Sequence, residues 1–422
     1  MKTTTPPAPF TIDYCSAKEI LDSRGRPTLE VEMRSSVHNV TASVPSGKSR
    51  GTREAFELRD ESGNMHLAIT NINDKIIPEI VGKEFNSPLE IDELLLKIDG
   101  TEDKSNLGAN TILAISIAVT KLAAVLEKKP LWQFIAEQNN TIPQLPKLFM
   151  NVINGGAHAN FNLPFQEYMI VPQNDSVKES YTQAQKIILS LGKELQDRFG
   201  KVMLGDEGGY APAMPKIETP FELLMNVIKN TKFDIKIAID SAASEFYEEG
   251  KYRLWDELVT PDKLLDLYQK IAWQYPILGI EDPFEENDSK RFAFLTESFR
   301  EKVRPVSILN KGGTPTKTII VGDDLTVTNP KIIEEMVKQK AATAVIIKPN
   351  QIGSLSEVYE AARVARENDW KLICSHRSGE TMDTFIADLA VGLGAFGIKA
   401  GSPLQEERKV KYERLLEIES EM

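Results

Sequence analysis

Residues 319–348 read IIVGDDLTVTNPKIIEEMVKQKAATAVIIK, and this stretch decides the fold. An apolar run (319–323) is followed by a segment of helical periodicity (330–339) and then by a second apolar run (344–348). A strand, a helix and a strand in this order predict two parallel strands joined by a helix. Each run also ends in a charged residue, Asp323 in the first and Lys348 in the second.

The same unit recurs along the second part of the chain. Short apolar runs stand at 236–240, 278–281, 319–323, 344–348, 372–376 and 397–399. Helical patterns stand between them at 262–273, 330–339, 354–367 and 384–393. This alternation predicts an α/β fold with a mainly parallel sheet, and its length fits a TIM-type (β/α)8 barrel.

The first part of the chain has a different pattern. Period-two alternation predicts strands at 28–33 and 37–44, and helical periodicity follows at 67–81, 89–98 and 110–127. A proline-containing segment, 141–146, reads as a linker. We therefore expect an N-terminal α+β cap domain over 1–140 and a barrel domain over 141–422.

The six apolar runs share a second feature, because each ends in a titratable residue: Asp240, Glu281, Asp323, Lys348, His376 or Lys399. For any single run, a solvated strand end explains such a residue. Six in succession are harder to explain in that way. In a parallel barrel the carboxyl ends of the strands meet on one face, where barrel enzymes hold their active sites.

Composition excludes several classes of function. With a net charge of -12, the chain is unsuited to nucleic acid or an anionic membrane as its main partner. Only two cysteines, Cys15 and Cys374, are present, so we expect no disulfide framework and a cytoplasmic location. No run of 18 successive apolar residues predicts a membrane span, and no apolar run near residue 1 predicts a signal peptide.

The residues at the strand ends indicate a chemistry. Asp240, Glu281 and Asp323 would repel one another unless a cation lay between them, and oxygen ligands favour Mg²⁺. A lysine beside that cation and a second lysine, as Lys348 beside Lys399 would be, should have a lowered pKa suited to a base. Arg377 is suited to a phosphate. Such a cluster fits removal of a proton next to a carboxylate, followed by loss of a leaving group.

Residues 44–52, VPSGKSRGT, look like part of a nucleotide-binding P-loop, since Gly47 is followed by Lys48 and Ser49. Pro45 lacks an N–H that a phosphate cradle would use, and the alternation at 40–44 is not that of a buried parallel strand. We interpret this stretch as a lid loop over the barrel, with Gly47 and Gly51 as its hinges.

Motifs spread over nearly the whole chain resemble those of the enolase family. They are DSRGRPT (22–28), PSGKS (45–49), GDEGG (205–209), SEF (244–246), EDPF (281–284), DDLTVTNP (323–330), KPNQIG (348–353) and SHRSGE (375–380). The resemblance implies reversible dehydration of 2-phosphoglycerate to phosphoenolpyruvate in glycolysis and gluconeogenesis, a hydro-lyase reaction (EC 4.2.1.11). It also implies a barrel whose first units depart from the plain strand–helix repeat.

The resemblance further implies roles for particular residues. Lys348 would take the C2 proton, and Glu207 would help the C3 hydroxyl to leave, assisted by Glu167. Other catalytic contacts would come from His158 and His376. Substrate would be bound by Gln166, His158, Lys348, Arg377, Ser378 and Lys399. One Mg²⁺ would be held by Asp240, Glu281 and Asp323, and a second, arriving with substrate, would involve Ser49. The family forms dimers or octamers of dimers, and a secondary pool at the cell surface or secreted is known among its members.

Several positions depart from the family pattern. Lys48 and Arg50 replace an alanine and a threonine in the lid, and Met382 stands where an acid is common. Gln405 and Glu417 replace arginines; two acids at Glu417 and Glu30 would repel across the usual dimer contact. Residues 304–317 read as an extra loop on the amino side of the barrel.

Two other interpretations remain open. A relative acting on an unphosphorylated acid, such as a sugar-acid dehydratase or racemase, would not need Ser49 or the Arg377–Ser378 pair. A surface adhesion protein that has lost catalysis would not need the full catalytic set.

Overall fold

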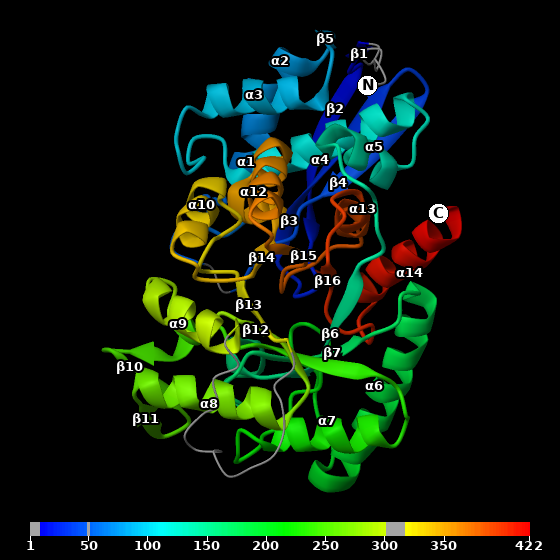
Figure 1. Ribbon diagram of the computed structural model, residues 1–422. Coiled ribbons are helices and arrows are strands. Elements are labelled where there is room, and N and C mark those ends of the chain that lie inside the picture. Colours follow the sequence, from blue (N-terminus) through cyan, green and yellow to red (C-terminus); the bar gives the residue numbers. More distant parts are fainter. Residues whose placement is uncertain (1–8, 49–50, 301–316) are drawn as a thin grey trace.

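The computed structural model describes residues 9–48, 51–300 and 317–422, which form an N-terminal α+β layer beside a barrel (Figure 1). Of the expected extra loop 304–317, only Lys317 is described. Ser49 and Arg50, at the centre of the lid loop, also lie outside the described residues.

The N-terminal layer, called the cap below, is built on an antiparallel sheet with the order β2-β3-β4. Its strands are β1 (Phe10–Thr11), β2 (Tyr14–Leu21), β3 (Pro27–Ser35), β4 (His38–Ser43) and β5 (Glu84–Phe85). Its helices are α1 (His66–Asn71), α2 (Ile77–Ile80), α3 (Pro88–Asp99), α4 (Ala109–Leu126) and α5 (Leu131–Asn139).

The predicted helix at 67–81 is not continuous. A π-helical turn, Ile72–Ile76, separates α1 from α2. Pro78 explains the interruption, because proline has no N–H to bond the carbonyl four residues earlier and its ring clashes with that carbonyl.

Helix α4 is the core helix of the cap. By length and composition it is the one helix of the described residues that could cross a membrane, but 83% of it is buried inside the protein. It packs against β3 and β4 of the cap (Figure 1) and against α11 (Pro349–Ile352) of the barrel. Its apolar character therefore serves the core.

Among the described residues, eight strands close into a barrel in the order β12-β13-β14-β15-β16-β6-β7-β8. They are β6 (Lys147–Asn154), β7 (Glu167–Pro172), β8 (Ile235–Asp240), β12 (Ile277–Glu281), β13 (Ile319–Gly322), β14 (Ala344–Ile347), β15 (Lys371–Ser375) and β16 (Gly397–Lys399). Strand β7 runs antiparallel to both β6 and β8, which confirms the expected departure of the first units. The other pairs are parallel.

Helices cover the barrel, and a small hairpin sheet is attached to it. The helices are α6 (Val177–Phe199), α7 (Thr219–Lys229), α8 (Pro261–Gln274), α9 (Ser289–Arg300), α10 (Pro330–Lys338), α11 (Pro349–Ile352), α12 (Leu355–Glu367), α13 (Phe385–Gly392) and α14 (Glu406–Glu421). The hairpin strands are β9 (Tyr247–Glu248), β10 (Lys251–Leu254) and β11 (Glu257–Val259). Alternate strand residues such as Ile319 and Val321 form an inner apolar cluster, as expected for a filled barrel.

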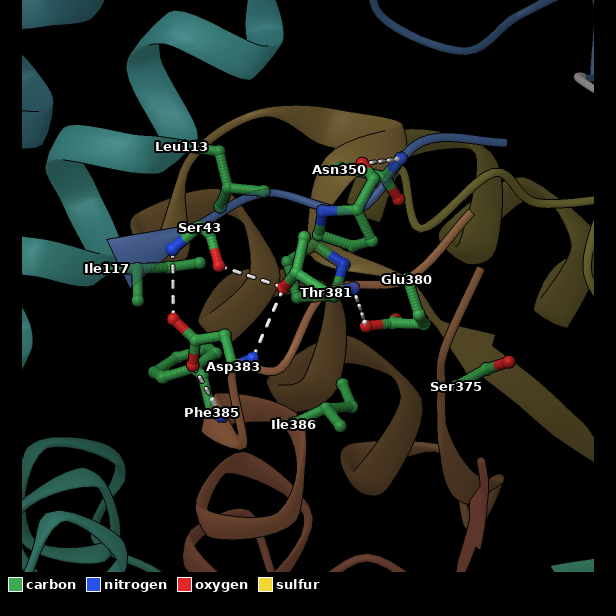
Figure 2. A pocket seen from close by; sticks show the side chains of 12 residues that line it. Ser43, Leu113, Ile117, Asn350, Ser375, Glu380, Thr381, Asp383, Phe385 and Ile386 are labelled. Carbon is green, nitrogen blue, oxygen red and sulfur yellow. Dashed lines mark hydrogen bonds between the residues drawn. The ribbon is translucent and has the colours of Figure 1, made fainter. Parts of the chain in front are cut away.

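Polar contacts join the cap to the barrel beside the carboxyl ends of the strands (Figure 2). Ser43 of β4 donates its backbone N–H to Asp383 at 2.9 Å and its hydroxyl to Thr381 at 2.8 Å. Lys121 of α4 reaches the same Asp383 carboxylate at 2.7 Å. A small cavity lies at this joint, with Asn350 and Ser375 on its border. The cap is thus fixed next to the barrel mouth.

Candidate active site

The predicted strand-end residues come together on one face of the barrel. Asp240 and Glu281 end β8 and β12 and are direct neighbours in register. Because β7 runs antiparallel, its first residue, Glu167, lies on this same face and pairs in register with Asp240. Lys399, at the end of β16, lies on the same face of the barrel as these three carboxylates. All four side chains are buried.

Lys399 lies among three of these carboxylates. Its Nζ is 3.0 Å from Asp240 Oδ2, 2.9 Å from Glu281 Oε1 and 3.2 Å from Glu167 Oε1. Burial alone would lower the pKa of Lys399, but the three carboxylates outweigh burial and raise it well above the usual range. Lys399 therefore carries a fixed positive charge.

Lys348 forms an ion pair with Asp323, directly after β13. Burial and the charges of Arg377 and Lys399 would lower the pKa of Lys348, but Asp323 outweighs them and the pKa is raised. This differs from the lowered value expected from the sequence. A lowered pKa requires that a cation neutralise Asp323, whereas here the Asp323 carboxylate binds the lysine directly.

Glu167 and Glu207 form a second group, together with His158. One oxygen or nitrogen atom from each of these side chains lies within 4.8 Å of the others. Burial and the charge of Glu207 raise the pKa of Glu167 well above its usual range. Glu207 behaves oppositely: burial would raise its pKa, but His376 and His158 hold it well below the usual range. Two buried carboxyls this close favour sharing one proton, held on Glu167.

Arg377 and Ser378, after β15, form the basic side of the site. Arg377 makes a two-armed ion pair with Glu54, with distances of 2.9 and 3.0 Å. The Ser378 hydroxyl accepts from the backbone N–H of Lys48 at 2.8 Å and from Arg24 at 3.2 Å. Glu54 and Arg24 could not be assigned to the site from the sequence pattern, because each lies in a cap loop without a periodic pattern.

Most of these residues border one small cavity, which is also lined by Gln166, His376 and Asp324. Four of the buried polar atoms here have no hydrogen-bond partner among the described residues: His158 Nδ1, Gln166 Oε1, Glu167 Oε2 and His376 Nε2. Buried polar atoms are rarely left without partners, so a polar ligand is the expected partner.

The donor set fits a hard divalent cation. Six carboxylates line the cavity (Glu54, Glu167, Glu207, Asp240, Asp323 and Asp324) against three basic side chains (Lys348, Arg377 and Lys399). Burial raises the pKa of Glu281 well above its usual range, and repulsion from the negative charges of Asp240 and Asp323 raises it further. Oxygen ligands under such mutual repulsion suit Mg²⁺.

The carboxylates that lie closest together are not the three predicted as metal ligands. The predicted trio of Asp240, Glu281 and Asp323 is not among the groups whose donor atoms all lie within 4.8 Å of one another. Asp323 instead joins Asp282 and Asp324 in such a group. Asp282 there accepts the backbone N–H groups of Asp323 at 3.0 Å and Asp324 at 2.7 Å, so it orients the turn that carries Asp323.

Comparisons with known proteins agree over nearly the whole chain. The family model described as "Enolase, N-terminal domain" matches residues 12–135, and "Enolase, C-terminal TIM barrel domain" matches residues 143–422. Enolases from Thermococcus gammatolerans and Pyrococcus furiosus are each 43% identical to it, over 98% of this chain and 96% of theirs. The enolase of Bdellovibrio bacteriovorus is also 43% identical, over 96% of this chain and 95% of its own. The chain therefore belongs to the enolase family.

Proposed function

We propose that this chain carries out the enolase reaction, 2-phosphoglycerate to phosphoenolpyruvate and water (EC 4.2.1.11), with Lys348 as base and Glu207 as acid. One observation carries the assignment of roles: both side chains border the same buried cavity as Arg377 and Ser378. A lysine, a carboxyl pair and a phosphate-binding group are the parts that the reaction requires.

In the first step Lys348 takes the C2 proton. The electron pair of that C–H bond moves toward the substrate carboxylate, which gains a second negative charge. When bound at Asp240, Glu281 and Asp323, Mg²⁺ would supply positive charge to stabilise that carboxylate and would compete with Lys348 for Asp323. Lys399, kept charged by its three carboxylate neighbours, lies next to the same ligands and would hold the carboxylate end of the substrate.

In the second step the C3–O bond breaks, and its electron pair leaves with the hydroxyl group. Glu207 would donate the proton that converts this group to water. The proton would come from Glu167, whose raised pKa makes it the protonated member of the pair. His158 Nδ1 lies 3.6 Å from Glu207 and 3.9 Å from Glu167, and would complete this acid group.

The remaining parts of the site follow the family. Arg377 and Ser378 would bind the substrate phosphate, with Gln166 and His376 as further contacts. A second Mg²⁺ that arrives with substrate would involve Ser49. We also propose cytoplasmic action and a division of the chain into domains at 140/141, next to the proline-containing segment.

We further propose a homodimer or an assembly of dimers. The repulsion expected between Glu30 and Glu417 is weakened within each chain. Glu30 pairs with Lys18 at 2.8 Å, and Glu417 pairs with Arg414 at 3.1 Å. Sedimentation of the purified protein measures this directly.

The activity is tested by following phosphoenolpyruvate in the ultraviolet after adding 2-phosphoglycerate and Mg²⁺. We expect absorbance to rise, EDTA to stop the rise and excess Mg²⁺ to restore it. No rise beside an active control enzyme would rule out the activity.

The assignment of base and acid is tested by exchange of the C2 hydrogen with solvent deuterium. Lys348→Ala removes the base, so we expect exchange to be lost. Glu207→Gln removes only the acid, so we expect exchange to persist while turnover falls. Exchange in both variants would contradict the assignment.

A further inference from the structure

Arg408, in the first turn of α14, is fully buried although it carries a permanent charge. No carboxylate of the described residues lies within 4.0 Å of its guanidinium nitrogens. A buried cation without a carboxylate partner is costly, so the position requires an explanation.

Its shortest hydrogen bonds go to the active site, and two longer ones go to Gln405 Oε1 at 3.4 Å and Ser23 Oγ at 3.5 Å. Its NH1 group donates to His376 Nδ1 at 2.7 Å and to the Arg377 carbonyl at 2.6 Å. Its NH2 group donates to the Ser378 carbonyl at 2.7 Å and to the Asp206 carbonyl at 3.2 Å. One side chain thus joins the loop after β15 to the loop that carries Glu207.

The contact with His376 fixes the position of a proton. Arginine has five N–H donors and no acceptor. His376 Nδ1 must therefore be the acceptor, and the ring proton must be on Nε2. His376 Nε2 lies 3.4 Å from Glu207 Oε2, so this N–H faces the carboxylate that we assign as the acid.

Burial keeps the ring of His376 neutral, and Arg408 adds to that effect. Burial, followed by the charge of Arg408, lowers the pKa of His376 to about 4, while Glu207 and Glu380 act in the opposite direction. Gly401 permits this close packing. It has a φ of +75°, and a Cβ there would lie 2.9 Å from the Glu207 carbonyl and from His376 Cε1.

We propose that Arg408 is a positioning residue that holds His376 as the neutral Nε2–H tautomer, so that this N–H stays turned toward Glu207 and the leaving hydroxyl and is available to donate there. The inference rests on the proposed role of Glu207, but its main test does not depend on turnover.

The test is NMR of the full-length protein with ¹⁵N-labelled histidine rings. The chain has only four histidines, and His376→Gln assigns the signal of interest. We expect Nε2 protonated, Nδ1 bare and no titration of His376 between about pH 6 and 8. Protonation of His376 at Nδ1, or titration of His376 in that pH range, would overturn the proposal. The unmodified protein is sufficient for this test.

Two variants extend the test. Arg408→Met removes both donors and charge, so we expect mixed tautomers at His376, a titration shifted toward neutral pH and kcat lowered by about 10- to 100-fold with little change in KM. Arg408→Lys keeps the positive charge but lacks the planar guanidinium group with its several N–H donors. We therefore expect kcat and the Nε2–H tautomer to be recovered only in part. Altered tautomers with unchanged kcat would overturn the positioning role.

Arg414→Met is the matched control. Arg414 lies on the same helix, but its ion pairs with described residues are with Asp388 at 2.8 Å and with Glu417 and Glu421 at 3.1 Å, all outside the site. We expect this variant to leave the His376 signal and kcat unchanged. If Arg414→Met and Arg408→Met alter His376 alike, the effect is general to α14 and the proposal fails. Absence of turnover in the unmodified protein, with the tautomer as expected, would instead reject the proposed function.

Discussion

Lys48, a departure from the family pattern in the lid loop, has a defined partner. Its Nζ lies 2.8 Å from Asp206 Oδ2 and 2.9 Å from the Ala157 carbonyl. It therefore joins the cap loop to two loops of the barrel rather than to acids of the cap. Asp206 precedes the proposed acid, Glu207, so this contact links the lid to the acid side of the site.

A double-mutant cycle separates linkage from electrostatic steering of the substrate. If Lys48 acts as a link, Lys48→Ala and Asp206→Asn should lower kcat/KM by similar factors, and the double variant should be no worse than either. Both side chains are partly exposed, so the coupling should be below about 1 kcal/mol. If Lys48 steers the anionic substrate, Asp206→Asn should instead raise kcat/KM at low salt. That outcome would contradict the link.

Residues at strand ends could be predicted from the sequence, but others of the site could not. Asp240, Glu281 and Lys399 follow apolar runs, and parallel topology brings such ends together. Arg408 could not be found in this way. It shares the buried face of α14 with Tyr412 and Leu415, and a charged residue on that face hides the amphipathic pattern from which burial is inferred.

At the scale of elements, the contact between α3 and α12 contains a buried carboxyl. Asp92 of α3 accepts the backbone N–H of Ser356, in the first turn of α12, at 2.8 Å. Burial raises the pKa of Asp92 to about 6, although bonds to Ser116 and Ser356 act against it. The folded protein therefore holds a proton on Asp92 between its ordinary pKa and about pH 6, and stability is lost as pH rises through that range.

Asp92→Asn removes this dependence. We subtract the parent's free energy of unfolding from that of the variant. This difference should increase by up to about 3 kcal/mol from pH 4 to pH 8, because only the parent loses stability as Asp92 ionises. Urea titrations of both proteins at several pH values measure this difference, and contributions common to both cancel. A difference that is constant with pH would show that Asp92 is ionised in the folded protein.

Six of the barrel strands could be predicted as elements, whereas β6 and β7 were missed. The rule that found the others requires an apolar run ending in a titratable residue. Because β7 runs against its neighbours, its titratable residue, Glu167, stands at its start. Strand β6 ends at the uncharged Asn154. Strand direction is decided by how the barrel closes, which local sequence does not encode.

At the scale of the whole molecule, cap and barrel share one apolar core. A single cluster of buried side chains includes Leu113 and Ile117 of α4 together with Phe385 and Ile386 of α13. Helix α5 packs on α13, and α3 packs on α12 (Figure 1). Separating the two parts would expose apolar surface on both. Each Å² of apolar surface exposed to water costs roughly 25 cal/mol of free energy.

We therefore expect cap and barrel to unfold together. Trp132 lies in α5 of the cap, whereas Trp255, Trp273 and Trp370 lie in the barrel. Replacing Trp132 with Phe leaves fluorescence that reports on the barrel. Replacing the other three leaves the fluorescence of Trp132, which reports on α5 of the cap where it meets Glu421 of α14. In urea, each variant's fluorescence should change together with its own far-ultraviolet circular dichroism, which reports on the whole chain.

Repeating the titrations at several protein concentrations separates subunit dissociation, which would move both signals together. A cap signal that is lost at lower urea than the circular dichroism would show that the shared core does not couple the two parts.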